Sequence, residues 1–509
     1  MSHLPEDRSV DRRALLKGAA VAGLSSFFEP LPRLLAATPS QRDLIRAENE
    51  RLGTTDWQLK TVRIDPRTRY RSPGIEGYCS RTSLRAGEKL QIMVSTNPPS
   101  PFLIDVYRLG YYGGKGGRHL QRMGSFAGRV QSDPQVGEER LRECRWEPAV
   151  EFAVPAEWPS GVYVGKLTAE RDSLQSYVIF IIRDDRACDF LFQCADTTWS
   201  AYNRWPDQYA LYDDGHKEWY IGPKTRVSWD RPYAKYCQVI DNPLFTGSGS
   251  FMLWEFPLAY WMEREGYDVS YQSTVDTHAE GAGLLRAKGF LSVGHDEYWS
   301  REMYNHVKAA VGAGVCAGFL SSDTCWGLIP FLPSGNGALH RVITRLGQFG
   351  PLDPDAVKTY PELARFEHFG PTESDLIGAR NVYPYCGGTD WICSADKHWL
   401  FAGTGMKDGD GIPGLVGFEW MGAPADIPGL EVVARGRVAY AGVERDYTAT
   451  IYPGPKDNIV FNAATIWWAD GLSAPPGYKT PSAHGATPKG PDLRVQTITA
   501  NLFRRMRGA

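Results

Sequence analysis

One run of six residues, 294–299, constrains the fold of this chain more than any other segment. The run reads Gly-His-Asp-Glu-Tyr-Trp, follows the apolar stretch 290–293, and precedes residues 301–312, whose pattern predicts a helix. A strand that ends in a tight glycine turn and leads into a helix is typical of open α/β sheets, which bind ligands outside the carboxyl ends of their strands. The alternative is that His295 and Asp296 only cap the helix, but capping does not need an imidazole and two carboxylates together.

The sequence pattern changes character near residue 185. Before it, short apolar runs separated by glycine and proline turns are typical of a β-sandwich. These runs are 89–94, 102–106, 162–167 and 177–182. After it, predicted strands alternate with predicted helices, which indicates a doubly wound, mostly parallel sheet. These strands are 189–195, 269–271, 290–293, 315–320 and 459–461.

We therefore predict an α/β fold in which a β-sandwich precedes a glutamine-amidotransferase-like α/β domain with long loop insertions. The glycine- and proline-rich middle of the second domain predicts loops over the active face. A terminal helix is predicted because Val495, Ile498, Leu502 and Met506 recur at helical spacing. The predicted boundaries are 1–37 for a signal peptide, 38–59 for a linker, 60–184 for the sandwich, 185–509 for the α/β domain, 327–425 for the loop-rich insertion and 492–507 for the terminal helix.

The amino-terminal segment predicts export. Arg12 and Arg13 precede an apolar run over residues 18–28, and the Ala-Ala pair 36–37 suits cleavage. The run is too short to span a membrane, so the pattern indicates a removable twin-arginine signal. We expect a periplasmic or extracellular protein with no membrane span in its mature chain. Since this route carries folded proteins, it also favours a cofactor inserted before export. The alternative is a chance arginine pair before a core helix.

The amino-acid composition limits the classes of molecule that the protein is expected to bind. The formal net charge of −3 indicates no nucleic acid or anionic membrane partner, so we expect a small-molecule substrate. The 25 Tyr and 16 Trp suit organic or sugar ligands as well as core packing. The nine cysteines are an odd number, so at least one thiol stays free or pairs between chains. Their spacing matches no zinc pattern, and none lies in a turn typical of a catalytic nucleophile.

Several motifs in order make the chain similar to the large-subunit family of N,N-dimethylformamidase. The motifs are at 77–81, 107–114, 197–203, 229–233, 294–299, 417–419 and 461–465. The resemblance implies hydrolysis of the C–N bond of a small formamide. It also implies one mononuclear iron held by two tyrosines and one glutamate, and such hard anionic oxygen ligands favour Fe(III).

The resemblance assigns roles residue by residue. Glu297 matches the glutamate ligand, and Tyr202 matches one tyrosine. His295 matches a histidine beside the metal, and Glu419 matches a carboxylate proposed as the general base. The ion would polarise the amide carbonyl or lower the pKa of bound water.

Two positions depart from the family pattern. Arg226 aligns with the second tyrosine, and its cation would oppose metal binding. Tyr233 lies nearby and is our candidate for the third metal ligand. Asp323 replaces an asparagine, and an ionised aspartate cannot donate the hydrogen bond that an amide donates. We count Asp323 as a catalytic candidate with His295 and Glu419.

The predicted strands bring these residues to one place. Tyr202, Glu297 and Asp323 each follow a strand of the predicted parallel sheet, so all three are expected at the same sheet edge. Glu419 is expected to reach this edge from the loop-rich insertion.

The leading hypothesis is an exported hydrolase of a linear amide or related C–N bond that uses one metal ion. The first alternative is a metal-free hydrolase or transferase in which His295 and either Glu297 or Asp323 form the acid/base pair. The second is a non-enzymatic exported protein that binds glycan or envelope material. No segment is similar to the small partner subunit of the formamidase, and the oligomeric state, a homo-oligomer included, stays open.

Overall fold

The chain is a mixed α/β protein with several sheets. The computed structural model describes residues 41–508 apart from 69, 218, 235–249, 384 and 481–486. The predicted signal peptide, residues 1–37, lies outside the described residues, so export stays a prediction. Among the described helices, none combines the length and the apolar character that a membrane crossing requires.

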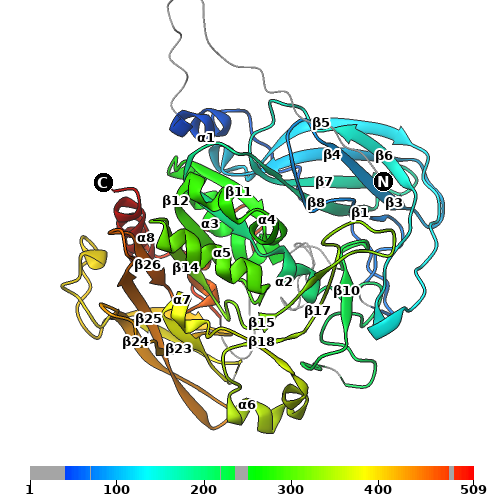
Figure 1. Cartoon of the computed structure of the whole chain (residues 1–509). Helices are drawn as coiled ribbons and strands as arrows, with labels where there is room; N and C mark the ends of the chain where they lie inside the picture. The colour runs from blue at the N-terminus through cyan, green and yellow to red at the C-terminus, as the bar shows by residue number, and fades with distance from the viewer. Residues whose placement is uncertain are drawn as a thin grey trace, which may run out of the picture. The chain divides into compact units, whose positions relative to one another are not determined.

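The largest sheet has seven strands in the order β11-β9-β12-β14-β26-β25-β24 (Figure 1). The first five pair in parallel, and the last two add antiparallel strands at one edge. The predicted strands 290–293 and 315–320 are neighbours, with Phe290 opposite Ala317, which confirms that pairing. The strand bounds are β9 Cys188–Cys194, β11 Val269–Ser273, β12 Ala287–His295, β14 Cys316–Ser322, β24 Glu431–Tyr440, β25 Val443–Pro453 and β26 Ile459–Asn462.

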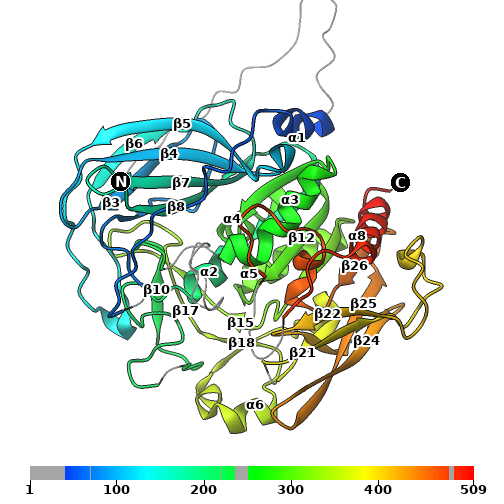
Figure 2. The same cartoon turned by 180° about the vertical axis from the view of Figure 1, so that it is seen from behind.

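Helices link and flank these strands. Helix α5, Arg301–Gly312, lies between β12 and β14 in the chain and covers the predicted range. It begins at Ser300, whose hydroxyl accepts a hydrogen bond from the Met303 backbone N–H and so satisfies a free donor of the first turn. Helix α8, Leu493–Met506, buries the four apolar residues that predicted it and lies beside β26 in both views (Figure 2). The other helices are α1 Gln41–Asn49, α2 Asp196–Ala201, α3 Phe256–Arg264, α4 Thr274–Ala279, α6 Pro354–Thr359 and α7 Ser374–Ile377.

Two smaller sheets occupy the region before residue 185. One has the order β1-β3-β6 and the other β2-β8-β7-β4-β5. Residues of both sheets, among them Ile92 and Phe180, share one hydrophobic core. The strand bounds are β1 Glu76–Cys79, β2 Ser83–Arg85, β3 Lys89–Ser95, β4 Phe102–Leu109, β5 Gly117–Phe126, β6 Pro148–Ala153, β7 Gly161–Ala169 and β8 Gln175–Arg183.

The five-stranded sheet is buried on both faces along its central strands. On β8, Val178 and Phe180 pack in the core shared with the three-stranded sheet, whereas Ile179 and Ile181 pack in the main core around the seven-stranded sheet. Successive side chains of a strand point to opposite faces, so one strand serves two cores. The β region and the α/β region are therefore joined by continuous packing, and both lie in one unit of contacts, Pro39–Ala509.

Polar contacts strengthen this junction. Arg108 on β4 donates to both carboxylate oxygens of Glu263 on α3 at 2.9 and 2.8 Å, and both side chains are fully buried. Helix α1 lies in the segment predicted as a linker, and its Ile45 is buried. Asn49 at its end donates to Glu263 at 2.9 Å. Contacts with distant residues therefore order this segment. The sequence pattern of a nine-residue helix is too short to indicate such contacts.

The predicted loop-rich insertion, 327–425, contains many short strands among its loops. Strands of this length are too short to show a periodic pattern, which is why the sequence predicted only loops there. The remaining strands are β10 Arg226–Ser228, β13 Tyr298–Trp299, β15 Gly327–Leu328, β16 Phe331–Leu332, β17 Val342–Thr344, β18 Gly347–Phe349, β19 His368–Gly370, β20 Ala379–Asn381, β21 Gly388–Ile392, β22 Gly411–Gly417 and β23 Met421–Pro424.

Candidate functional site

The carboxyl ends of three neighbouring parallel strands deliver the predicted site residues. β9 leads into α2, which ends just before Tyr202. β12 ends at His295, and β14 ends just before Asp323. Gly294 has a φ of 67°, and a Cβ at this position would lie 2.6 Å from atoms of Trp254. Glycine is therefore required for the turn at the end of β12.

Two tyrosines converge on one carboxylate. The Tyr202 hydroxyl donates to Glu297 Oε2 at 2.6 Å, and the Tyr212 hydroxyl lies 2.7 Å from Glu297 Oε1. The two phenol oxygens are themselves 2.6 Å apart, and the rings stack at a centroid distance of 4.5 Å. Each phenol carries one proton, so three short oxygen–oxygen contacts share two protons. A cation among these oxygens would resolve this mismatch.

The buried Arg345 contacts Tyr212 both directly and through Tyr298. Arg345 donates to the Tyr298 hydroxyl at 2.8 Å, and Tyr298 donates to the Tyr212 hydroxyl at 2.7 Å. The Arg345 Cζ atom lies 4.2 Å from the Tyr212 ring centroid. Arg345 also donates to the backbone carbonyls of Leu211 and Tyr220. It therefore anchors the loop that carries Tyr212 and places a positive charge beside its phenol.

His295 lies between two carboxylates. Its Nε2 atom is 2.8 Å from Glu419 Oε2 and 3.2 Å from Glu297 Oε2. Burial alone would lower the pKa of His295, but the negative charges of Glu419 and Glu297 raise it well above its usual value. Burial would raise the pKa of Glu297, yet His295 and the two phenols hold it below its usual value. The chain thus favours an imidazolium beside an ionised Glu297.

Two polar atoms of this group lack a good hydrogen bond. Among the described residues, His295 Nε2 and Glu419 Oε2 form no hydrogen bond of good geometry, although they lie 2.8 Å apart as an ion pair and both atoms are buried. Burial raises the pKa of Glu419. A carboxylate whose pKa is raised above its usual value is a stronger base, which suits it to accept a proton.

Asp323 is a third carboxyl group in the same cluster. Burial, together with the charges of Glu419 and Glu297, raises the pKa of Asp323 well above its usual value. One oxygen of Asp323, one of Glu419 and one nitrogen of His295 lie within 4.8 Å of one another. A protonated carboxyl group can donate a hydrogen bond as an amide does. The departure from asparagine at this position is therefore compatible with the donor role.

These side chains line a pocket of about 330 Å³. Five polar residues of the site, Tyr202, Tyr212, Glu297, Asp323 and Glu419, form one part of its lining. Large apolar side chains form most of the rest. A concave, mostly apolar pocket with a few convergent polar groups is typical of a small-molecule site.

The cysteines do not supply a nucleophile to this pocket. The eight described cysteines form no disulfide with one another, and Cys237 lies outside the described residues. Cys386 lines the pocket, but burial raises its pKa to about 12. Since the thiolate is the reactive form, a thiol with such a pKa is inert at neutral pH.

The structure places Tyr233 apart from this pocket. Its ring lines a separate small cavity together with Tyr78, Asp196 and Arg341. Five of the six predicted site residues, all but Tyr233, come together. Tyr212 is the second tyrosine beside Glu297, and we therefore replace Tyr233 with Tyr212 as the candidate ligand.

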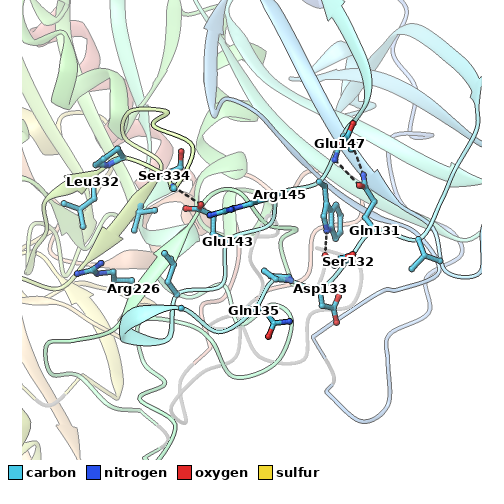
Figure 3. Close-up of a pocket in the computed structure, with 18 of the residues that line it drawn as sticks. Gln131, Ser132, Asp133, Gln135, Glu143, Arg145, Glu147, Arg226, Leu332 and Ser334 are labelled. Atoms are coloured by element: carbon cyan, nitrogen blue, oxygen red, sulfur yellow. Dashed lines mark hydrogen bonds between the residues drawn. The ribbon is translucent and has the colours of Figure 1, made fainter.

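Arg226 also lies outside the site. It is on β10 and forms ion pairs with Glu138 at 3.1 Å and Glu139 at 2.8 Å. It lines the larger pocket of about 1100 Å³ between residues 129–147 and 332–335 (Figure 3). Its cation is therefore neutralised by its own partners and lines a different pocket from the tyrosine pair.

Three contributors were missed in the sequence. Tyr212 is ten positions after Tyr202, in a segment without periodicity, and Arg345 is in the middle of the predicted loops. Tyr298 belongs to the run 294–299, but its contact with Tyr212 is not indicated by the sequence. One feature of the sequence could have indicated all three. A phenol or guanidinium among apolar residues is costly to bury unless it has a hydrogen-bond or ion-pair partner. That feature does not say which partner it has.

The donor set fits a hard trivalent cation. Tyr202, Tyr212 and Glu297 offer three converging oxygens of the kind that favours Fe(III). The proton mismatch among these oxygens accords with a bound ion. Burial raises the pKa of both phenols well above the usual value, so an ion would have to displace their protons.

Comparison with known proteins agrees with the motifs. A search of curated proteins found no match. Residues 103–482, more than half of the chain, match the family model described as N,N-dimethylformamidase beta subunit-like, C-terminal. This match contains every residue of the tyrosine–glutamate site and its histidine. The chain therefore belongs to the N,N-dimethylformamidase beta subunit-like family.

Proposed function

We propose that this protein hydrolyses the C–N bond of a linear amide with one ferric ion held by Tyr202, Tyr212 and Glu297. The observation that carries the proposal is the convergence of both phenol oxygens on the Glu297 carboxylate at 2.6 and 2.7 Å. When bound, such an ion supplies Lewis-acid polarisation of a carbonyl and acidifies water. Family membership supports the same chemistry.

The remaining residues divide the proton transfers. Glu419 accepts a proton from the attacking water at its carboxylate, and its raised pKa suits this task. His295, 2.8 Å from Glu419, holds a compensating positive charge and orients that carboxylate. Asp323, whose raised pKa favours its protonated form, donates a proton to the leaving nitrogen. Water thus adds at the carbonyl carbon, the C–N bond breaks, and the amine leaves with a proton.

The test joins metal content to turnover. The purified protein should hold about one iron per chain and absorb visible light through tyrosinate-to-iron charge transfer. It should release an amine from a simple formamide. Glu297→Ala should lose the iron, the colour and the activity together, because one of three hard ligands is gone. An iron-free, colourless protein that still hydrolyses the amide would favour the metal-free acid/base alternative. Binding of glycan without turnover would favour the non-enzymatic one.

We also propose an architecture for the two regions of the chain and a cellular location for the protein. We interpret the two sheets before residue 185 as a β-sandwich, because residues of both share one core. We interpret the seven-stranded sheet as doubly wound, because helices alternate with its parallel strands. We also propose export by the twin-arginine pathway, to the periplasm or beyond, from the pattern around Arg12 and Arg13.

A further inference from the structure

The lining of the active pocket has an aromatic wall that the chemistry at Glu297 does not use. Its five rings are those of Trp219, Trp326, Tyr360, Tyr385 and Phe418, and Ile221 lines the same pocket. Tyr385 lies next to two of the other rings, with centroid distances of 6.2 Å to Trp326 and 6.3 Å to Tyr360. These three rings therefore form one continuous surface, from three separate segments of the chain.

The backbone holds two members of this wall in an unfavourable conformation. Trp219 has a φ of 60° and Phe418 has a φ of 64°. A bulky residue in the left-handed region costs free energy, and such outliers cluster at ligand sites where the surrounding structure holds them. The strain therefore points to a ligand-binding role for these two rings.

The rings do not form a cage for a cation. Cations already lie over three rings of the pocket: Arg345 at 4.2 Å from Tyr212, Arg204 at 4.9 Å from Trp219, and Lys217 at 5.3 Å from Tyr360. A cation over a ring uses the negative potential of its face. The wall is thus better suited to a neutral group than to an ammonium group.

The pocket is also larger than a small formamide needs. Its volume of about 330 Å³ lies within the range of about 300–1,000 Å³ of pockets that bind drug-sized ligands. N,N-dimethylformamide would leave most of this space unfilled. An aromatic ring attached to the amide nitrogen would fill it and would stack on the wall.

We propose that the natural substrate is an amide whose nitrogen carries a neutral aromatic substituent, which stacks on the wall of Trp219, Trp326, Tyr360, Tyr385 and Phe418. This inference rests on the proposed function for the reaction but makes its own claim about binding. In the reaction, water contributes its oxygen to the carbonyl carbon and a proton to Glu419, the C–N bond breaks, and the nitrogen leaves as an amine that carries the aromatic group and the proton donated by Asp323. No oxidant or reductant is needed.

The experiment compares N-benzylformamide with N-methylformamide, whose leaving groups are both alkylamines. We expect kcat/KM to favour N-benzylformamide by about a hundredfold or more. Removing a wall ring in Trp219→Ala or Trp326→Ala should reduce this preference by on the order of tenfold. Trp219→Phe should retain most of it. Trp399→Ala, which changes a partly exposed tryptophan outside the pocket, should leave the preference unchanged.

A binding measurement separates this inference from the proposed function. Both amides are titrated calorimetrically into the Glu419→Gln variant, which should turn over slowly. Tighter binding of N-benzylformamide that weakens in Trp219→Ala/Glu419→Gln supports the wall even if wild-type protein hydrolyses neither amide. Hydrolysis without preference for the benzyl substituent would reject the binding role of the aromatic wall but would still support the proposed function. Binding of N-acetylglucosamine in place of N-benzylformamide would also reject that binding role.

Discussion

The hydroxyl oxygens of Tyr202 and Tyr212 lie 2.6 Å apart, and both face the Glu297 carboxylate. One tyrosine follows α2 and the other is in the loop that Arg345 anchors. Their approach is the feature on which the metal proposal depends, because two phenols and one carboxylate are a hard anionic donor set.

Tyr212, rather than Tyr233, should be required for iron. Tyr212→Phe removes one of three ligand oxygens and should abolish the visible band and most of the bound iron. Tyr233→Phe is the matched control, since its ring lines a separate cavity, and it should keep both. Iron analysis and absorption spectra of the two variants measure this. Loss of iron in Tyr233→Phe with retention in Tyr212→Phe would reverse our assignment.

Glu419 should act in turnover and not in metal retention. Glu419→Gln removes the proton acceptor but keeps the size of the side chain, so kcat should fall by about 10²- to 10⁴-fold. Iron content and the visible band should stay at wild-type levels. Steady-state kinetics beside metal analysis check this. A variant that loses its iron would make Glu419 a ligand instead.

The buried pair between β4 and α3 should be essential for stability. Arg108→Met leaves Glu263 buried without its cation, which should lower the free energy of unfolding by about 3–5 kcal/mol. The double variant Arg108→Met/Glu263→Met should recover part of the loss. Lys358→Met is the control because its ion pair with Asp355 is exposed, and it should be neutral. Urea unfolding measures all three.

Asp470 should make stability depend on pH. Burial raises its pKa from 3.8 to about 7, so the folded state favours the protonated form. Its contribution is complete below about pH 4 and is lost as the pH rises through about 7. Between about pH 5 and 8, Asp470→Asn should show a flatter stability profile than wild type. Asp457→Asn changes an exposed aspartate whose pKa is lowered, so its profile there should match wild type.

Export should depend on the arginine pair. Changing Arg12 and Arg13 together to Lys should leave an unprocessed precursor in the cytoplasm, because the twin-arginine route reads this pair. Arg8→Lys, upstream of the pair, should be processed normally. Immunoblots of cell fractions distinguish precursor from mature protein. Normal processing of the double variant would reject the signal.

Much of the secondary structure was predictable because its signals are local. Helix α5 occupies the predicted residues 301–312, and β12 and β14 contain the predicted strands beside it. The same edge of the sheet collects Tyr202 and Asp323 because parallel strands end together. In contrast, the helix α1 in the predicted linker was missed, since its order comes from contacts with distant segments.

By itself, the sequence determined the alternation of strands and helices and the strand-end position of Glu297, because apolar periodicity, caps and glycine turns act over a few residues. It also carried the motifs of the family. Only the tertiary structure decided that Tyr212 is the second phenol, that Tyr233 and Arg226 line other cavities, and that burial and neighbouring carboxylates raise the pKa of Asp323. Those facts depend on which distant side chains share a buried volume, and burial and charge act through space rather than along the chain.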